Sequence, residues 1–173
     1  MKLNKPKSLV KLTFLFSIVF LSGYSQNSKE LKTIDKGIAQ IEKTYDAFED
    51  ETTWKSPILK NVVFYKYKDK NGEMTNYLVL RTKGLTLNIG EKGLMVIFED
   101  GTRFEKANAE VDYDSSSGAG WDYKVFIRIN DDELSLFAEK KIKAYRLYIY
   151  DGNLSEKDKL LAMGWAKGII NSN

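Results

Sequence analysis

The side chains of this sequence best suited to acid–base chemistry are carboxylates, because the chain contains no histidine and no cysteine. Asp112 and Asp114 are two positions apart, and an extended strand places side chains with that spacing on one face. A glycoside hydrolase needs two carboxyl groups, one to protonate the leaving oxygen and one to activate water or attack the sugar. This pair keeps a carboxylate-based hydrolase or carbohydrate-processing domain open as an alternative function.

The missing residue types exclude several kinds of site. Without histidine or cysteine, the ordinary Ser-His-Asp and Cys-His nucleophilic systems cannot be built. The usual zinc ligands are absent for the same reason, and no glycine pattern of a nucleotide-binding loop occurs. We therefore expect no catalytic constellation, no cofactor and no metal site, and the sequence favours a protein that is not an enzyme.

Two other acidic clusters are explained by local structure. Asn130 precedes Asp131, Asp132 and Glu133, which predicts a helix whose N-cap is Asn130 and whose capping box is completed by Glu133. The segment 69–73 resembles the start of a calcium loop. It lacks the third ligand before its glycine and the later bidentate glutamate, so it predicts a turn.

Aromatic side chains form the second set with binding chemistry, because flat rings on an exposed sheet can stack on sugars or extended peptides. The two richest segments contain Trp121, Tyr123, Tyr145, Tyr148 and Tyr150. Core and cross-strand packing is the favoured explanation, since one face of each strand must be buried. A sugar-binding module without catalysis instead requires that Tyr148 and Tyr150, or Trp121 and Tyr123, be coplanar and exposed. Arg146, beside Tyr148 and Tyr150, marks the patch of greatest interest.

The elements that must position these residues are mainly β-strands. Strands are expected over residues 58–68, 77–82, 85–89, 94–99, 102–106, 109–113, 121–129 and 141–150. Asp100-Gly101 is typical of a two-residue hairpin turn. The pattern predicts an antiparallel β-sandwich or barrel-like sheet, with a short helix near 131–138 and a C-terminal helix near 155–170.

The start of the domain and the packing of its strands are less directly indicated by the sequence. The pattern of residues 34–48 fits either a helix or a strand. A strand over about 43–56 is favoured. Several strands are apolar on both faces, so we expect a second sheet to cover one face and the C-terminal helix the other. Gly164 and Gly168 on that helix would allow it to approach the sheet closely.

The N-terminus has the order of a secretory signal peptide. Four lysines lie within the first eleven residues, and an apolar run of ten residues, 12–21, follows. Gly23 and Ser25 place small residues at −3 and −1 of a cut before Gln26. An uncleaved anchor fits less well, because a membrane-spanning helix needs about 20 apolar residues. We expect residues 1–25 to be cleaved and the protein to be exported.

Cleavage would change the charge of the chain. Residues 1–25 contain four of the 27 basic residues and none of the 24 acidic ones, which leaves 23 against 24 and a net charge of −1. A nucleic-acid partner is therefore not expected, because binding to phosphate needs a basic excess.

We expect residues 26–173 to form one globular domain, of which the polar residues 26–33 are mobile.

Three segments together show a resemblance to known proteins: Tyr45 to Trp54, Gly93 to Gly101, and Glu133 to Ala138 continuing into Ile142 to Tyr150. They resemble the small, uncharacterised exported β-rich proteins common in Bacteroidota. The resemblance implies a periplasmic or secreted location and transfers no functional residues. We expect a non-enzymatic binding or structural module of the cell envelope. Its partner would be an envelope protein or a small ligand, and its mature chain would have no transmembrane segment.

Overall fold

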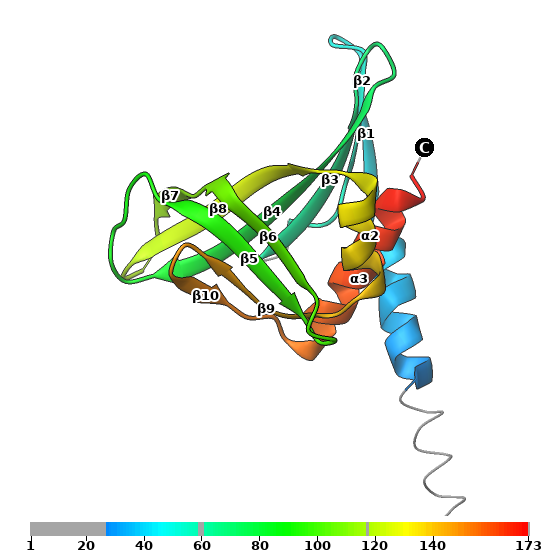
Figure 1. Cartoon of the computed structure of the whole chain (residues 1–173). Coiled ribbons are helices and arrows are strands. Elements are labelled where there is room, and N and C mark those ends of the chain that lie inside the picture. Colours follow the sequence, from blue (N-terminus) through cyan, green and yellow to red (C-terminus); the bar gives the residue numbers. More distant parts are fainter. Residues whose placement is uncertain (1–26, 59–60, 117, 173) are drawn as a thin grey trace, which may run out of the picture. The chain divides into compact units, whose positions relative to one another are not determined.

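The computed structural model describes residues 27–58, 61–116 and 118–172 (Figure 1). The predicted signal peptide, residues 1–25, lies outside the described residues. Residues 27–38 are helical, including most of the segment expected to be mobile. The chain divides into two units after Lys32, and the following description concerns the second unit. None of the described helices is both long enough and apolar enough to span a membrane.

The second unit contains two antiparallel sheets, which confirms the prediction of a mainly β, sandwich-like fold. The larger sheet has the strand order β1-β2-β3-β4-β8-β7, and the smaller has the order β10-β9-β5-β6. The described strands form no closed barrel. The strands are β1 (Glu42–Asp46), β2 (Glu51–Lys55), β3 (Val62–Lys68), β4 (Met74–Gly84), β5 (Lys92–Phe98), β6 (Arg103–Glu110), β7 (Asp112–Ser115), β8 (Trp121–Ile129), β9 (Ile142–Leu147) and β10 (Tyr150–Gly152).

Both predicted helices are present, as α2 (Asp131–Glu139) and α3 (Glu156–Ile170). The capping box at α2 is confirmed. The Asn130 side chain accepts a hydrogen bond from the Glu133 amide at 2.8 Å, and the Glu133 carboxylate accepts one from the Asn130 amide at 3.0 Å. These bonds satisfy amide groups that would otherwise have no partner in the first helical turn.

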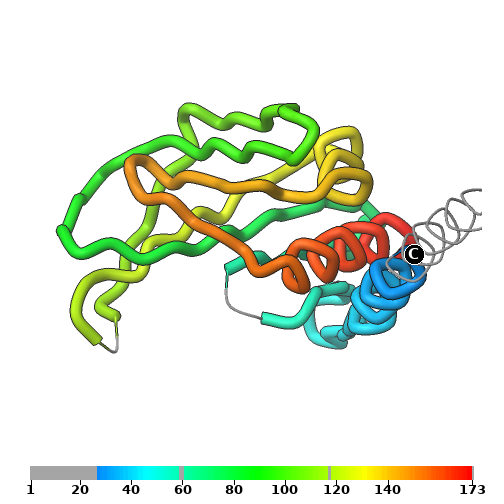
Figure 2. The backbone as a smooth tube through the Cα atoms, turned by 90° about the horizontal axis from the view of Figure 1, so that it is seen from below, coloured from blue at the N-terminus to red at the C-terminus, as the bar shows by residue number. Residues whose placement is uncertain are grey.

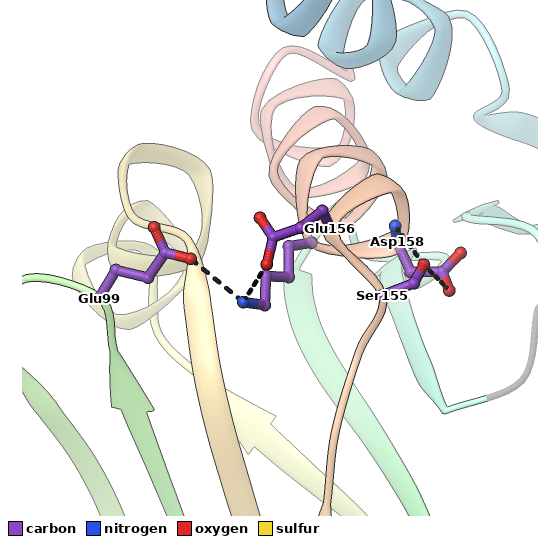
Figure 3. A network of polar contacts seen from close by, with 5 residues as sticks. Glu99, Ser155, Glu156 and Asp158 are labelled. Carbon is purple, nitrogen blue, oxygen red and sulfur yellow. Dashed lines mark hydrogen bonds and ion pairs between the residues drawn. The ribbon is translucent and has the colours of Figure 1, made fainter.

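The first turn of α3 is fixed both by its own cap and by a contact with the smaller sheet. Ser155 Oγ accepts a hydrogen bond from the amide of Asp158 at 3.2 Å. Lys159 Nζ lies 2.6 Å from a carboxylate oxygen of Glu156 and 3.1 Å from one of Glu99, just after β5 (Figure 3). The lysine therefore links the smaller sheet to the start of the C-terminal helix.

Several strand boundaries differ from the prediction. Residues 85–89 form no strand, because the chain leaves β4 at Gly84 and runs as an irregular segment to β5. The expected strand 102–106 continues as far as Glu110 in β6, and the expected strand 109–113 is divided between the end of β6 and the start of β7. The β5–β6 turn has three residues rather than two, since the amide of Phe98 donates to the carbonyl of Thr102. Gly101, at φ 84°, supplies the left-handed residue that this longer turn needs.

The expected strand 141–150 is broken at Tyr148 and Ile149, which form the tight turn between β9 and β10. Tyr148 has φ 53°, an unusual conformation for a residue with a side chain. Residues 34–48 contain both kinds of structure. The helix ends at residue 38, and a β1–β2 hairpin with a turn at 47–50 follows, so the favoured strand 43–56 is two strands.

The core shows that the second sheet and the helices cover the same face of the larger sheet. The ring of Phe137 in α2 makes edge-to-face contacts with the rings of Phe64 in β3, Phe98 in β5 and Phe104 in β6. Lys66, two residues after Phe64 and on the same face, donates to the carbonyl of Ser172 just beyond α3. The expectation that α3 covers the opposite face is therefore wrong. Figure 1 shows α2 and α3 beside the ends of β5 and β9.

The close approach made possible by the glycines of α3 is to the N-terminal helix rather than to a sheet. A Cβ atom on Gly164 would lie 2.9 Å from the Cα of Gly37 and would overlap the carbonyl oxygen of Ile34. A Cβ atom on Gly168 would meet the backbone of Ile38 at 3.3 Å. Backbone in direct contact leaves no room for a side chain. The predicted close approach is confirmed, and its partner was wrongly assigned.

Candidate functional site

The alternation of side chains along the strands defines a second face of the larger sheet, which points away from the smaller sheet. We call it the outer face. Cross-strand pairing arranges its side chains in the rows Lys55–Tyr65–Tyr77–Arg128, Val63–Val79–Phe126, Arg81–Lys124–Asp112 and Lys83–Asp122–Asp114. Because the helices and the smaller sheet pack on the other face, these rows are the natural place to look for a binding surface.

Three aromatic rings lie at the centre of the outer face, and we call them the ring cluster: Tyr65, Tyr77 and Phe126. The Phe126 ring stacks on the Tyr77 ring, with centroids 4.9 Å apart and planes 25° apart. The centroid of the Phe126 ring is 6.2 Å from that of the Tyr65 ring, and the two ring planes are tilted by 52°. Stacking of this kind adds about 0.5–1.5 kcal/mol per ring pair beyond the burial of area. It also holds the rings in fixed positions relative to one another.

The ring cluster remains accessible although its surroundings are packed. Phe126 is 55% exposed, whereas Val63 and Val79 in the same row are buried. Both tyrosine rings are half-buried. Within the described residues, neither the Tyr65 nor the Tyr77 hydroxyl has a hydrogen-bond partner. The cluster therefore offers a flat apolar surface with hydroxyl groups that can still bond to a ligand.

Tyr67 lies beside the ring cluster on β3, but its hydroxyl is hydrogen-bonded within the protein. A hydrogen bond to the Glu51 carboxylate raises the pKa of the Tyr67 hydroxyl to about 12, with a smaller contribution from loss of solvent. The negative carboxylate favours the protonated phenol because it accepts that proton and repels a phenolate. Tyr67 therefore links β3 to the start of β2 and contributes no free hydroxyl to the surface.

A charged depression of about 490 Å³ adjoins the ring cluster at the β7 end of the outer face. Its charged lining residues are Arg81, Lys83, Asp114, Asp122 and Lys124. Lys83 lies 3.6 Å from Asp122, and Lys124 lies 3.2 Å from Asp114, so both carboxylates have cationic partners. The Arg81 guanidinium has no ion-pair or hydrogen-bond partner among the described residues. The described lining residues thus include one cation without a counter-charge.

The carboxylate pair considered for hydrolysis lies on this same face. Asp112 and Asp114 are both on the exposed edge strand β7, as their spacing predicts. Asp112 is opposite Lys124, and Asp114 is ion-paired with that lysine. The two acids therefore follow one exposed strand beside a cation instead of facing each other across a cleft. This geometry gives acid–base chemistry little support. No group of acidic side chains that could hold a metal ion occurs within the described residues.

Most of the aromatic residues named from the sequence pack against other rings or in the core, as the favoured explanation expects. Tyr123 is buried and stacks on the half-buried Tyr150, with centroids 4.3 Å apart and planes 20° apart. Trp121 is half-buried, and its ring meets the Tyr113 ring edge-on, with centroids 5.9 Å apart. Tyr148 lies on the β9–β10 turn and is exposed. Neither Tyr148 and Tyr150 nor Trp121 and Tyr123 therefore form an exposed coplanar pair.

The remaining aromatic residue of that region and its arginine also have internal roles. Tyr145 is buried, and its hydroxyl donates to the carbonyl of Arg81, while burial raises the pKa of that hydroxyl. Arg146 makes two hydrogen bonds to Asp151, at 2.6 and 3.2 Å. The patch around Arg146 therefore consists of a paired cation, the Tyr150 ring stacked on Tyr123, and the Tyr148 ring exposed on the β9–β10 turn.

The ring cluster was not found from the sequence, although one signal was available. Phe126 alternates with Tyr123, Val125 and Ile127 on the best-defined strand, so its assignment to the opposite face was correct. Tyr65 and Tyr77 face each other in the β3–β4 hairpin, but they join Phe126 only through the β4–β8 register, which pairs segments far apart in the sequence. An apolar residue on the face otherwise occupied by charge would have been the clue.

Comparison with known proteins gives no functional assignment, because no family model, curated protein or solved structure matches the chain. The outer face, with its ring cluster and charged depression, is therefore the basis on which a function can be proposed.

Proposed function

We propose that this protein is an exported, non-enzymatic module of the cell envelope that binds a glycan on the outer face. The observation that carries the proposal is the ring cluster, in which Tyr65, Tyr77 and Phe126 are fixed by stacking and remain accessible. The less polar face of a pyranose ring packs well on such rings, while its hydroxyls need hydrogen-bond partners. The free tyrosine hydroxyls and the adjoining charged side chains would supply them.

Three further features support a binding role for an exported protein. The lysine-rich start and short apolar run at residues 1–25 support export. The absence of cysteine and histidine from the sequence removes the commonest catalytic nucleophile and base. The exposed carboxylates Asp112 and Asp114 are arranged along one strand, which is more suitable for hydrogen bonds to sugar hydroxyls than for paired acid–base catalysis.

The proposal is tested by affinity electrophoresis of the purified protein through native gels containing soluble neutral or acidic polysaccharides. We expect at least one polysaccharide to retard the wild-type protein and Phe126→Ala to weaken that retardation about tenfold or more. Loss of one stacked ring of about 1.4 kcal/mol corresponds to that factor. Phe48→Ala is the matched control, because Phe48 is 99% exposed on the distant β1–β2 turn.

Two results would count against glycan binding at the ring cluster. One is migration of the wild-type protein that no polysaccharide in the panel alters. The other is equal weakening by Phe48→Ala and Phe126→Ala, which would show that exposed phenylalanine is sticky wherever it lies. Circular dichroism of both variants would establish that each remains folded.

A further inference from the structure

The charged depression contains a cation that none of the described residues neutralises. The Lys83 ammonium group lies 3.6 Å from the Asp122 carboxylate. The Lys124 ammonium group lies 3.2 Å from the Asp114 carboxylate. Arg81 is half-buried and has no such partner among the described residues. A guanidinium group without a counter-charge can form charge-assisted hydrogen bonds with an anionic ligand. A ligand that brought an anionic group to this position would therefore gain an interaction that the protein leaves unused.

Arg81 lies at a distance from the ring cluster that one ligand can span. It follows Val79 by two residues on the same face of β4, and Val79 is directly opposite Phe126. Two residues of an antiparallel strand rise about 6.8 Å. A sugar ring stacked on Phe126 would thus lie within reach of the long arginine side chain, with no change in the backbone.

The chemistry of the guanidinium group selects the kind of anion. Its planar fork of N–H groups matches the two oxygens of a carboxylate, and such charge-assisted bonds are roughly twice as strong as neutral ones. A uronic acid combines a carboxylate with a pyranose ring in a single residue. We infer that the outer face binds an acidic, uronate-containing glycan, with a sugar ring on the ring cluster and its carboxylate on Arg81.

This inference rests on the proposed glycan-binding function and adds the charge of the ligand. It accounts for the two lysine–aspartate pairs around Arg81, because the paired lysines leave the arginine as the one cation without a counter-charge among the described residues that line the depression. Neutral glycans could use the ring cluster but would gain nothing from that charge. The carboxylate should therefore determine which glycans bind tightly.

The test is isothermal titration calorimetry with polygalacturonate and with its fully methyl-esterified form, at about 0.15 M salt to screen distant charges. We expect the wild-type protein to bind the free acid about tenfold or more tightly than the ester. Arg81→Gln should remove that preference, and Arg81→Lys should restore only part of it. The matched control is Arg103→Gln, an exposed arginine on β6 of the other sheet, which should bind like the wild type.

The outcomes separate this inference from the function on which it rests. Equal affinity for the acid and the ester, or an unchanged preference in Arg81→Gln, would refute the role of Arg81. If Phe126→Ala still weakened binding of both forms, glycan binding at the ring cluster would stand. Failure of the wild-type protein to bind either form would refute the inference, and the polysaccharide panel would then decide the proposed function independently.

Discussion

The Tyr123 and Tyr150 rings stack with centroids 4.3 Å apart, and both hydroxyls donate to the same carbonyl oxygen, that of Thr86. Both hydroxyls also accept a hydrogen bond from Asn88, one from its amide and one from its side chain. The two tyrosines thereby fasten the irregular segment 85–91 to β8 and β10. Figure 2 shows this segment and the β9–β10 hairpin at one end of the two sheets, with α2 and α3 at the other end.

We predict that Tyr150→Phe loosens this segment without disturbing the core. The ring remains stacked, but the bonds to Thr86 and Asn88 are lost. Amide hydrogen exchange over residues 85–91 should become several-fold faster, because local opening requires fewer bonds to break. Hydrogen-exchange mass spectrometry measures this directly. Tyr148→Phe is the control, since the Tyr148 hydroxyl has no partner among the described residues, and equal effects of the two changes would contradict the prediction.

The contact between Gly164 and the N-terminal helix predicts a large loss of stability on adding one methyl group. Gly164→Ala would drive its Cβ into the backbone around Ile34 and Gly37, which cannot move aside as a flexible side chain can. We expect a loss of about 1–3 kcal/mol or more in the free energy of unfolding, measured by urea denaturation. Gly118→Ala enters open space and should be close to neutral. A stable Gly164→Ala protein would show that the two helices do not pack as described.

Lys66 provides a test of how α3 ends. Its ammonium group lies within hydrogen-bond distance of the carbonyl oxygens of Ile170, at 3.4 Å, and Ser172, at 2.9 Å. Burial lowers the pKa of Lys66, with a nearby Asp131 opposing the shift. Lys66→Met keeps an unbranched apolar stem of nearly the same length and removes the ammonium donor.

We expect Lys66→Met to lower the free energy of unfolding by about 1–3 kcal/mol, because the carbonyl groups it serves lose a charged donor. Exchange of the amides in the last turn of α3 should also increase. Lys68→Met is the matched control, since Lys68 lies two residues further along β3 and is exposed. A Lys66→Met protein as stable as the Lys68→Met protein would mean that this buried cation contributes nothing to the helix end.

The parts of the fold that were predicted correctly depend on local signals. The alternation over Trp121–Ile129 and the caps at Asn130 and Ser155 involve residues close in sequence, so their physics can be evaluated without knowing the fold. The β9–β10 turn has no such signal. Its turn residues, Tyr148 and Ile149, are neither glycine nor asparagine, and Tyr148 adopts φ 53°, which its residue type does not predict.

The site was harder to predict than the strands because it depends on register between distant segments. Tyr77 and Phe126 are neighbours only because β4 pairs with β8, and a shift of one residue would turn either ring into the core. The placement of α2 and α3 on the inner face is equally non-local. The sequence shows that some strands are apolar on both faces, but it does not show which partner covers each face.

The turn between β5 and β6 predicts a specific dependence of stability on pH. The Lys140 ammonium lies 2.7 Å from the Asp100 carboxylate, and the amide of Thr102 donates to the same carboxylate. These contacts lower the pKa of Asp100 from 3.8 to about 2, and the bond to Lys140 contributes most. Because the folded protein binds this proton more weakly than the unfolded chain does, the carboxylate stabilises the fold above about pH 4. That contribution is lost as the pH falls from about 4 to about 2.

Asp100→Asn should therefore be less stable than the wild type at pH 7, and the difference should shrink between about pH 4 and pH 2. Urea denaturation at several pH values measures both proteins. Lys140→Met should show the same behaviour, because it removes the main cause of the lowered pKa. A difference between Asp100→Asn and the wild type that remained constant down to pH 2 would mean that the side-chain amide fails for steric reasons, and that the ionised Asp100–Lys140 contact does not stabilise the turn.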